Sequence, residues 1–190
     1  MSILLLMNAP GASTEAYDRT NELMGIRGDT DAPPGLVSHC CGVDDQGIVA
    51  VDVWESEEAL NRFFEERLGA ALAQTGLAAT PRIMPVHNLI RQGAGTVPGV
   101  LLIWEADGFT TDAYDAITAN LAAHEGDGSA HPAVSHVAAT TEGGMVFVDV
   151  WDSAESAARF VETQIAPAAG GHLPEGAPRF TRVHNRMRGA

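Results

Sequence analysis

Lysine is absent from the sequence: all eleven basic residues are arginines, against 25 aspartates and glutamates. No side-chain amine is therefore present for Schiff-base chemistry. With a formal net charge of −14 at pH 7, the chain also lacks the clustered cations that bind phosphate backbones or anionic lipids. We expect neither a nucleic acid nor a membrane as a partner.

Cysteines and long apolar runs are also scarce. The two cysteines, Cys40 and Cys41, are neighbours in a predicted strand, so their side chains point to opposite faces and do not easily bond each other. Such thiols fit a reducing compartment. No apolar run approaches the ~20 residues of a membrane span, and residues 1–7 lack the basic flank and the length of a signal peptide. We therefore expect a cytoplasmic protein.

The sequence repeats itself at a single offset of 97 residues, the difference between positions 134 and 37. The matching segments are Val37-Ser38-His39 with Val134-Ser135-His136, Val51-Asp52-Val53-Trp54 with Val148-Asp149-Val150-Trp151, Val86-His87-Asn88 with Val183-His184-Asn185, and Ala16-Tyr17-Asp18 with Ala113-Tyr114-Asp115. Because one offset fits them all, no net insertion separates the halves. The pattern predicts a tandem duplication of one compact unit.

The hydrophobic period changes in the same order in each half. An apolar run is followed by a capped helical pattern, two strand-like runs around a polar turn, a second helical pattern and a last strand. In the first half these segments are Ile3 to Met7, Thr14 to Ile26, Leu36 to Val43, Gly47 to Trp54, a helix capped by Ser56 with Leu60, Phe63, Phe64 and Leu68 on one face, and Ile83 to Ile90. The order βαββαβ predicts a ferredoxin-like α+β unit.

The two ferredoxin-like repeats should occupy residues 1–91 and 100–190, with a linker at 92–99. Such a unit leaves one sheet face bare, and that face needs a partner. We expect the two bare faces to pack sheet to sheet as an intrachain, pseudo-dimeric α+β barrel. The protein would then be a monomer with an internal pseudo-twofold axis, and further homo-oligomerisation stays open.

The third predicted strand has two different faces. In residues 49–54 the valines point one way, whereas Ala50, Asp52 and Trp54 point the other. The valine face suits packing against the sheet of the sister repeat. The mixed face should look into a cleft beneath the helices.

The segment Trp54-Glu55-Ser56-Glu57-Glu58-Ala59-Leu60 resembles the dimeric α+β barrel superfamily, especially its antibiotic-biosynthesis-monooxygenase-like branch. The resemblance covers both repeats and is more specific for fold than for activity, because the superfamily includes cofactor-free quinone-forming oxygenases, heme-degrading enzymes, polyketide cyclases and lactone isomerases. It implies that Trp54 and Trp151 line a substrate cleft. Heme-degrading members bind iron through a histidine on the second helix, but residues 56–75 and 153–170 contain none.

A carboxylate inside an apolar strand, as at Asp52, is costly unless it finds a partner. With the hairpin closed around residues 44–45, His39 lies opposite Ala50 and diagonal to Asp52, within side-chain reach. A His–Asp pair can act as a general base toward an acidic phenol or enol, beside a tryptophan that stacks on the substrate. Alternatively, the two side chains only satisfy each other's hydrogen-bonding groups and have a structural role. The second half contains the same pair, His136 and Asp149.

Other polar residues leave alternatives open. His87 and His184 on the last strands either face the cleft or form hydrogen bonds near the barrel rim. Tyr17 and Tyr114, just after the first-helix cap, fit either the core or the cleft. The repeated histidines and aspartates do not have the helical i, i+4 spacing or the Cys/His clustering of a metal site. We therefore expect no metal.

The two halves differ where the cleft should be. At matching positions Ala50 is replaced by Phe147, Met7 by Trp104 and Asn8 by Glu105. Phe147 should partly fill the second cleft and leave the larger pocket in the first half. Glu105 would add an acid or a base to the second site.

These features predict a cofactor-independent small-molecule enzyme, a monooxygenase or a cyclase acting on an aromatic, polyketide-like substrate. The candidate catalytic residues are His39, Asp52, His136 and Asp149, and the candidate substrate-binding residues are Trp54, Trp151, Ala50, His87, His184 and Glu105. One alternative is a non-catalytic ligand-binding or structural barrel. A third is a heme-binding member.

Overall fold

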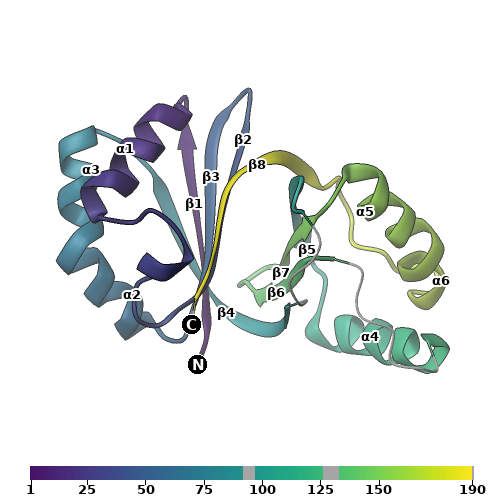
Figure 1. The fold of residues 1–190 in the computed structure, drawn as a ribbon. Helices are drawn as coiled ribbons and strands as arrows, with labels where there is room; N and C mark the ends of the chain where they lie inside the picture. Colours follow the sequence, from purple (N-terminus) through teal and green to yellow (C-terminus); the bar gives the residue numbers. More distant parts are fainter. Residues whose placement is uncertain (92–96, 126–132, 190) are drawn as a thin grey trace. The chain divides into compact units, whose positions relative to one another are not determined.

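The computed structural model describes residues 1–91, 97–125 and 133–189 (Figure 1). The backbone hydrogen bonds join the strands in the order β1-β3-β2-β8-β5-β7-β6-β4, which closes into a barrel. The strands are β1 (Ile3–Pro10), β2 (Leu36–Asp44), β3 (Gly47–Trp54), β4 (Thr80–Arg91), β5 (Val100–Asp107), β6 (Ser135–Thr140), β7 (Gly144–Trp151) and β8 (Arg179–Arg188). The predicted α+β class is confirmed. Residues 92–96 of the expected linker lie outside the described residues.

The chain divides into two compact units. The first unit contains residues 1–85 and 181–190, and the second unit contains residues 86–180. The last strand of each half therefore gives its C-terminal part to the unit that holds the other half's helices. This division governs which residues complete each candidate site.

The first unit carries its helices on one side of its strands (Figure 1). They are α1 (Thr14–Met24), a 3-10 turn (Asp29–Asp31), α2 (Glu57–Phe63), a π-helical turn (Phe64–Leu68) and α3 (Gly69–Thr75). Ser13 caps α1, and Ser56 caps α2 as predicted, because each hydroxyl accepts a hydrogen bond from the backbone N–H three residues on. Gly25, at φ 72°, ends α1 in the left-handed region that glycine adopts without strain.

The π-helical turn corrects one expected helix face. Leu60, Phe63 and Leu68 are buried, but Phe64 is 50% exposed. In a π-helix the residue five positions on, rather than four, returns to the same face. Leu68 therefore follows Phe63 on the core side, and Phe64 points to solvent.

The β2–β3 hairpin also has a different register from the predicted one. Asp44 pairs with Gly47, so the turn consists of Asp45 and Gln46 rather than residues 44–45. His39 consequently pairs directly with Asp52. A shift of two residues keeps every side chain on its face, so the expected pairing survives the error.

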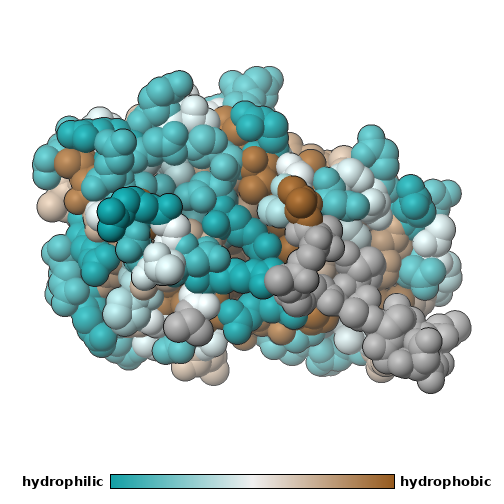
Figure 2. Space-filling model, in the orientation of Figure 1, coloured by the Kyte–Doolittle hydropathy of each residue, from teal (hydrophilic) through white to brown (hydrophobic). Residues whose placement is uncertain are grey.

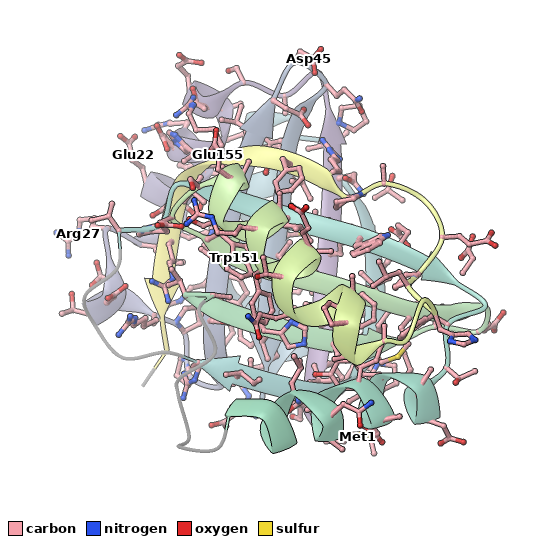
Figure 3. The ribbon with its side chains drawn as sticks, turned by 90° about the vertical axis from the view of Figure 1, so that its right-hand side faces the viewer. Met1, Glu22, Arg27, Asp45, Trp151 and Glu155 are labelled. Atoms are coloured by element: carbon pink, nitrogen blue, oxygen red, sulfur yellow. The ribbon has the colours of Figure 1, made fainter. Side chains whose placement is uncertain are left out.

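The second unit repeats the order of elements. Its helical segments are α4 (Thr111–Glu125), α5 (Ala154–Phe160), a π-helical turn (Val161–Ile165) and α6 (Ala166–Ala168). Trp151, at the end of β7, is 2% exposed and packs against Phe160 of α5 with ring centroids 5.5 Å apart. Figure 3 shows Trp151 behind α5 and Asp45 at the tip of the β2–β3 hairpin.

Polar and charged side chains cover much of the face in Figure 2, as expected from the composition. Among the described residues, no helix is long and apolar enough to cross a membrane. The apolar side chains concentrate beneath the helices, where Trp54 is 0% exposed. The residues clustered with it include Leu5, Leu60, Phe63 and Leu68.

Candidate functional site

The buried pair His39 and Asp52 forms the centre of the site in the first unit. Nδ1 of His39 lies 2.5 Å from Oδ1 of Asp52, and the two residues are 8% and 5% exposed. A carboxylate accepts hydrogen bonds, so it fixes the imidazole tautomer in which Nδ1 carries the proton. Nε2 is then an acceptor.

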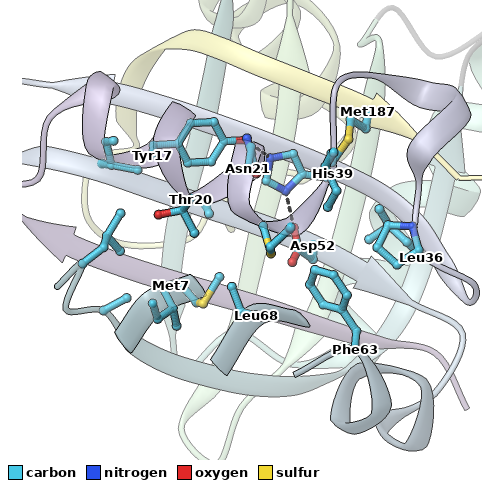
Figure 4. A pocket seen from close by; sticks show the side chains of 18 of the residues that line it. Met7, Tyr17, Thr20, Asn21, Leu36, His39, Asp52, Phe63, Leu68 and Met187 are labelled. Carbon is cyan, nitrogen blue, oxygen red and sulfur yellow. Dashed lines mark hydrogen bonds and ion pairs between the residues drawn. The ribbon is translucent and has the colours of Figure 1, made fainter. Parts of the chain in front are cut away.

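Tyr17 on α1 extends this pair into a chain of hydrogen bonds. Its hydroxyl lies 2.6 Å from Nε2 of His39 and donates to it, and Nδ2 of Asn185 donates to the hydroxyl oxygen at 3.0 Å. Figure 4 shows Tyr17, His39 and Asp52 in this sequence along one wall. Donation therefore runs in one direction, from Asn185 through Tyr17 and His39 to Asp52.

A β-bulge lets two consecutive residues of β8 reach α1. On a regular strand His184 and Asn185 would point to opposite faces. The pairing of β8 with β2 passes from Asn185 to Val183 and leaves His184 as the extra residue, which redirects its side chain. Nε2 of His184 lies 2.8 Å from Oδ1 of Asp18, and its ring meets that of Tyr17 edge-on at 5.6 Å.

A mainly apolar cavity of about 70 Å³ lies beside this chain. Tyr17, His39 and Asp52 all line it, so the polar chain forms one of its walls. Ala50 and Trp54 line it as the strand alternation predicted. Further lining residues come from β1 and the helical segments and include Met7, Phe63 and Leu68 (Figure 4). Met24 and Leu72 line it as well.

The second unit contains the same chain of hydrogen bonds. The hydroxyl of Tyr114 lies 2.9 Å from Nε2 of His136, whose Nδ1 lies 2.6 Å from Oδ1 of Asp149. Nδ2 of Asn88 donates to the Tyr114 hydroxyl at 2.8 Å. Both units thus hold an Asn–Tyr–His–Asp chain.

His87 occupies a bulge like that of His184. The pairing of β4 with β6 passes from Val86 to Asn88, and Nε2 of His87 lies 2.8 Å from Oδ1 of Asp115. Neither His87 nor His184 is among the residues that line the cavities. Of the two alternatives, the hydrogen-bonding one matches their positions.

The second cavity has a volume of about 110 Å³ as the described residues bound it. The expectation that Phe147 would fill this cleft and leave the first half with the larger pocket is therefore wrong. Phe147 lies against the wall, stacked on Tyr114 with centroids 5.8 Å apart and an interplanar angle of 21°. Leu36 and Leu72 of the first cavity correspond to the smaller Ala133 and Ala169, whereas Met7 of that cavity corresponds to the larger Trp104.

Glu105 does not take the position that the sequence suggested. It is exposed on β5 and is not among the residues that line the second cavity, whereas its neighbours Trp104 and Ala106 point the other way. Trp151 lines that cavity as expected. In the first unit the indole N–H of Trp54 is buried and has no hydrogen-bond partner among the described residues.

Among the described residues, neither cavity is lined by an imidazole with a ring nitrogen left for a heme iron or another metal. No group of three or more His, Cys, Asp or Glu side chains in the described residues is placed to hold a metal ion. The helical segments 57–75 and 154–168 contain no histidine. In both cavities the lining imidazole, His39 or His136, already has both ring nitrogens in hydrogen bonds within the chain.

Burial controls the ionisation of the site tyrosines. It raises the pKa of Tyr17 strongly, and the Cys41 thiol adds to this, while hydrogen bonds from Asn21 and Asn185 act in the opposite direction. Burial also raises the pKa of Tyr114, and the hydrogen bond from Asn88 opposes it. Both phenols are therefore neutral donors at neutral pH.

Sequence reasoning did not assign Tyr17, Tyr114, Asn88 or Asn185 to the site. The sequence nevertheless contains a signal for these residues, because each of them recurs at the 97-residue offset. Strand alternation alone could not place a histidine and the asparagine after it on one side, since this requires a bulge.

No known family model matches the sequence, and no curated protein sequence does either. Solved structures do share the fold. A protein of Lactobacillus acidophilus, provisionally named a monooxygenase, is 14% identical, with a TM-score of 0.66 over 98% of this chain and 96% of its own. An anthrone oxidase-like protein is 17% identical, with a TM-score of 0.55 over 98% and 92%.

A third similar structure, from Fusobacterium nucleatum and also provisionally named a monooxygenase, is 8% identical with a TM-score of 0.65 over 98% and 94% of the two chains. At these identities the likeness is one of fold. The class of architecture is thus an α+β barrel.

Proposed function

We propose that the chain is a cofactor-independent oxidase or monooxygenase that removes a proton from a small phenolic or enolic substrate. One observation carries the proposal: each unit places a Tyr–His–Asp chain along the wall of an apolar cavity. An oriented imidazole with a carboxylate behind it is an arrangement for general-base catalysis. The neighbours named monooxygenase or anthrone oxidase-like agree with this class.

In the proposed mechanism the tyrosine hydroxyl relays the proton. A substrate hydroxyl or acidic C–H donates to the Tyr17 oxygen while the Tyr17 proton passes to Nε2 of His39. Asp52, hydrogen-bonded to Nδ1, stabilises the imidazolium that forms. Because the transfer is concerted, no free tyrosinate is required, and the raised pKa of Tyr17 does not oppose the step.

O₂ then oxidises the deprotonated substrate by accepting electrons from it. For hydroquinone as a test compound, a phenolic hydroxyl loses its proton, O₂ takes two electrons from the anion, and hydroquinone plus O₂ gives 1,4-benzoquinone plus hydrogen peroxide. O₂ is the only co-reactant. A cyclase would use the same proton transfer and place the electron pair in a new C–C bond instead.

The finer interpretation of the sequence also belongs to this proposal. We take the chain to be a tandem duplication of two ferredoxin-like repeats in the antibiotic-biosynthesis-monooxygenase-like branch, acting on an aromatic, polyketide-like compound. The 97-residue offset and the matching order of elements support it.

The test measures O₂ uptake and benzoquinone absorbance with hydroquinone, a single-ring phenol, as the probe. Replacing both imidazoles, with His39→Gln and His136→Gln in one chain, should lower the rate by about 10²- to 10⁴-fold. Arg19→Ala is the control, because Arg19 forms only an exposed ion pair with Glu22. A wild-type protein that does not accelerate the reaction, or a double variant at the wild-type rate, would overturn the proposal.

A non-catalytic ligand-binding protein is the second candidate. It is favoured by the closure of the hydrogen-bond chain, since both nitrogens of His39 are satisfied inside the fold. On this account the double histidine variant would bind the same ligands more weakly or not at all, and neither protein would consume O₂.

A further inference from the structure

We infer that the cavity of the second unit is a site for a single aromatic ring, whereas the cavity of the first unit takes a smaller, non-aromatic enol. This deepens the proposed function and rests on it for treating both cavities as substrate sites. The difference comes from the walls around two matching polar chains.

Aromatic residues replace small or flexible ones at three matching positions. Trp104, Phe109 and Phe147 line the second cavity. Their counterparts 97 residues earlier are Met7, Ala12 and Ala50. Aromatic walls recognise flat rings through stacked and edge-to-face contacts, which are favourable beyond the area they bury.

These aromatic side chains are held in place before a ligand arrives. Phe147 is stacked on Tyr114, and the ring of Phe109 meets Phe147 edge-on at 5.7 Å and 82°. Nε1 of Trp104 donates to the Glu175 carbonyl at 3.3 Å. A ring that enters therefore meets fixed faces, which reduces the entropy cost of binding.

The space in the second cavity suits one ring. Its volume of about 110 Å³ is of the same order as engineered apolar cavities of about 150 Å³ that bind benzene. A phenolic hydroxyl on that ring can reach the wall formed by Tyr114, His136 and Asp149.

The first cavity is smaller and has a more polar edge. Its volume is about 70 Å³, roughly half that of the engineered cavities of about 150 Å³ that bind benzene. Asn21, 9% exposed, lies in its wall and lowers the pKa of Tyr17, where the second cavity has Thr118. An amide beside the tyrosine hydroxyl suits a compact ligand with a carbonyl and an enol.

The experiment titrates the intact protein with 4-fluorophenol and follows ¹⁹F NMR. We expect one equivalent bound per chain. Phe147→Leu, which keeps an apolar side chain but removes the ring, should weaken binding about 3- to 10-fold. Ala50→Phe, the matched change in the first unit, should leave the affinity unchanged.

Two bound equivalents, an unchanged affinity in Phe147→Leu, or an equal loss in Ala50→Phe would overturn the inference. Urea unfolding of each variant checks that it is folded. If Phe147→Leu does not fold, Trp104→Met, which restores the first-half residue, carries the same expectation.

Binding of 4-fluorophenol does not depend on turnover, so the two proposals fail separately. A protein that binds one ring through Phe147 but never consumes O₂ would overturn the proposed function alone. An active protein that binds the ring equally in both cavities would overturn only this inference.

Discussion

The two units share their hydrogen-bond chains and differ in the apolar walls around them. The Asn–Tyr–His–Asp chain has heavy-atom distances of 2.5–3.0 Å in the first unit and 2.6–2.9 Å in the second. The facing walls change from Met7 and Ala50 to Trp104 and Phe147. The geometry of the hydrogen-bond chain is thus similar in the two units, whereas the side chains around the space beside it differ.

The largest expected difference between the two units is in the stability lost when a buried carboxylate loses its histidine partner. The side chain of Asp52 is 7% exposed and that of Asp149 is 14% exposed. His39→Ala leaves Asp52 as an unpaired buried charge and should cost about 3–5 kcal/mol of unfolding free energy. His136→Ala should cost less, because Asp149 retains more water.

Urea unfolding curves measure both effects. The double change His39→Leu with Asp52→Leu serves as the control, because it removes the stranded charge and should recover much of the loss. If the single and double variants were equally unstable, packing rather than charge burial would dominate at this position.

The next largest difference between the two units should appear at alkaline pH, in the ionisation of their tyrosines. Unfolded tyrosine titrates at a pKa of about 10, and burial raises the pKa of Tyr17 strongly and that of Tyr114 as well. Above pH 10 the unfolded chain loses phenolic protons that the folded chain keeps. The free energy of unfolding should therefore fall as pH rises, by up to about 1.4 kcal/mol per pH unit for each tyrosine.

The chain has only two tyrosines, so absorbance at 295 nm reports on the two sites directly. Tyr114 should ionise first, and Tyr114→Phe assigns the transitions. Simultaneous titration of both phenols in the folded protein at the pH of free tyrosine would contradict this description of their burial.

The donors from the last strands should have a smaller effect. Asn185→Leu removes a hydrogen bond to Tyr17 at similar side-chain size and should cost about 1 kcal/mol. It should also raise the pKa of Tyr17 further, because Asn185 now lowers it. The matching change Asn88→Leu should act on Tyr114 instead.

The tyrosine titration distinguishes positioning from simple packing. In a protein with Asn185→Leu, the Tyr17 transition should move and the Tyr114 transition should stay. A variant that loses stability while neither transition moves would reduce Asn185 to a structural contact.

The smallest effect should be the same in both units. Ser56 and Ser153 each accept a hydrogen bond from the backbone at the start of a helix, at 3.3 and 3.1 Å. Ser56→Ala and Ser153→Ala should each cost about 1 kcal/mol in urea unfolding. Clearly unequal costs would mean that the scaffolds of the two units, and not only their cavity walls, have diverged.

Much of the fold could be read from the sequence, because local patterns specify it. The caps at Ser13 and Ser56, the alternation in β3 and the order of elements all depend on neighbours close in the chain. The π-helical turn at Phe64–Leu68 could not be read in this way. A helical wheel assumes a constant 3.6-residue period, and the turn changes it.

The sequence predicted the His–Asp pair of the candidate site but did not assign the tyrosine and the asparagine to it. His39 and Asp52 lie on one hairpin, so alternation brought them together despite the two-residue error in register. Tyr17 and Asn185 come from elements 168 residues apart, and a bulge decides where Asn185 points. The error over Phe147 had a different cause, because the sequence gives its side-chain volume but not that its ring is stacked on Tyr114 at the wall.

The exchange of strand ends also affects how the gene can change. Each half encodes a dipeptide, His87-Asn88 or His184-Asn185, that serves the tyrosine encoded by the other half. A stop codon after position 180 would remove the Asn185 donor from the first unit while leaving Asn88 in the second. The histidine of each half therefore belongs to a chain of hydrogen bonds whose asparagine is encoded by the other half.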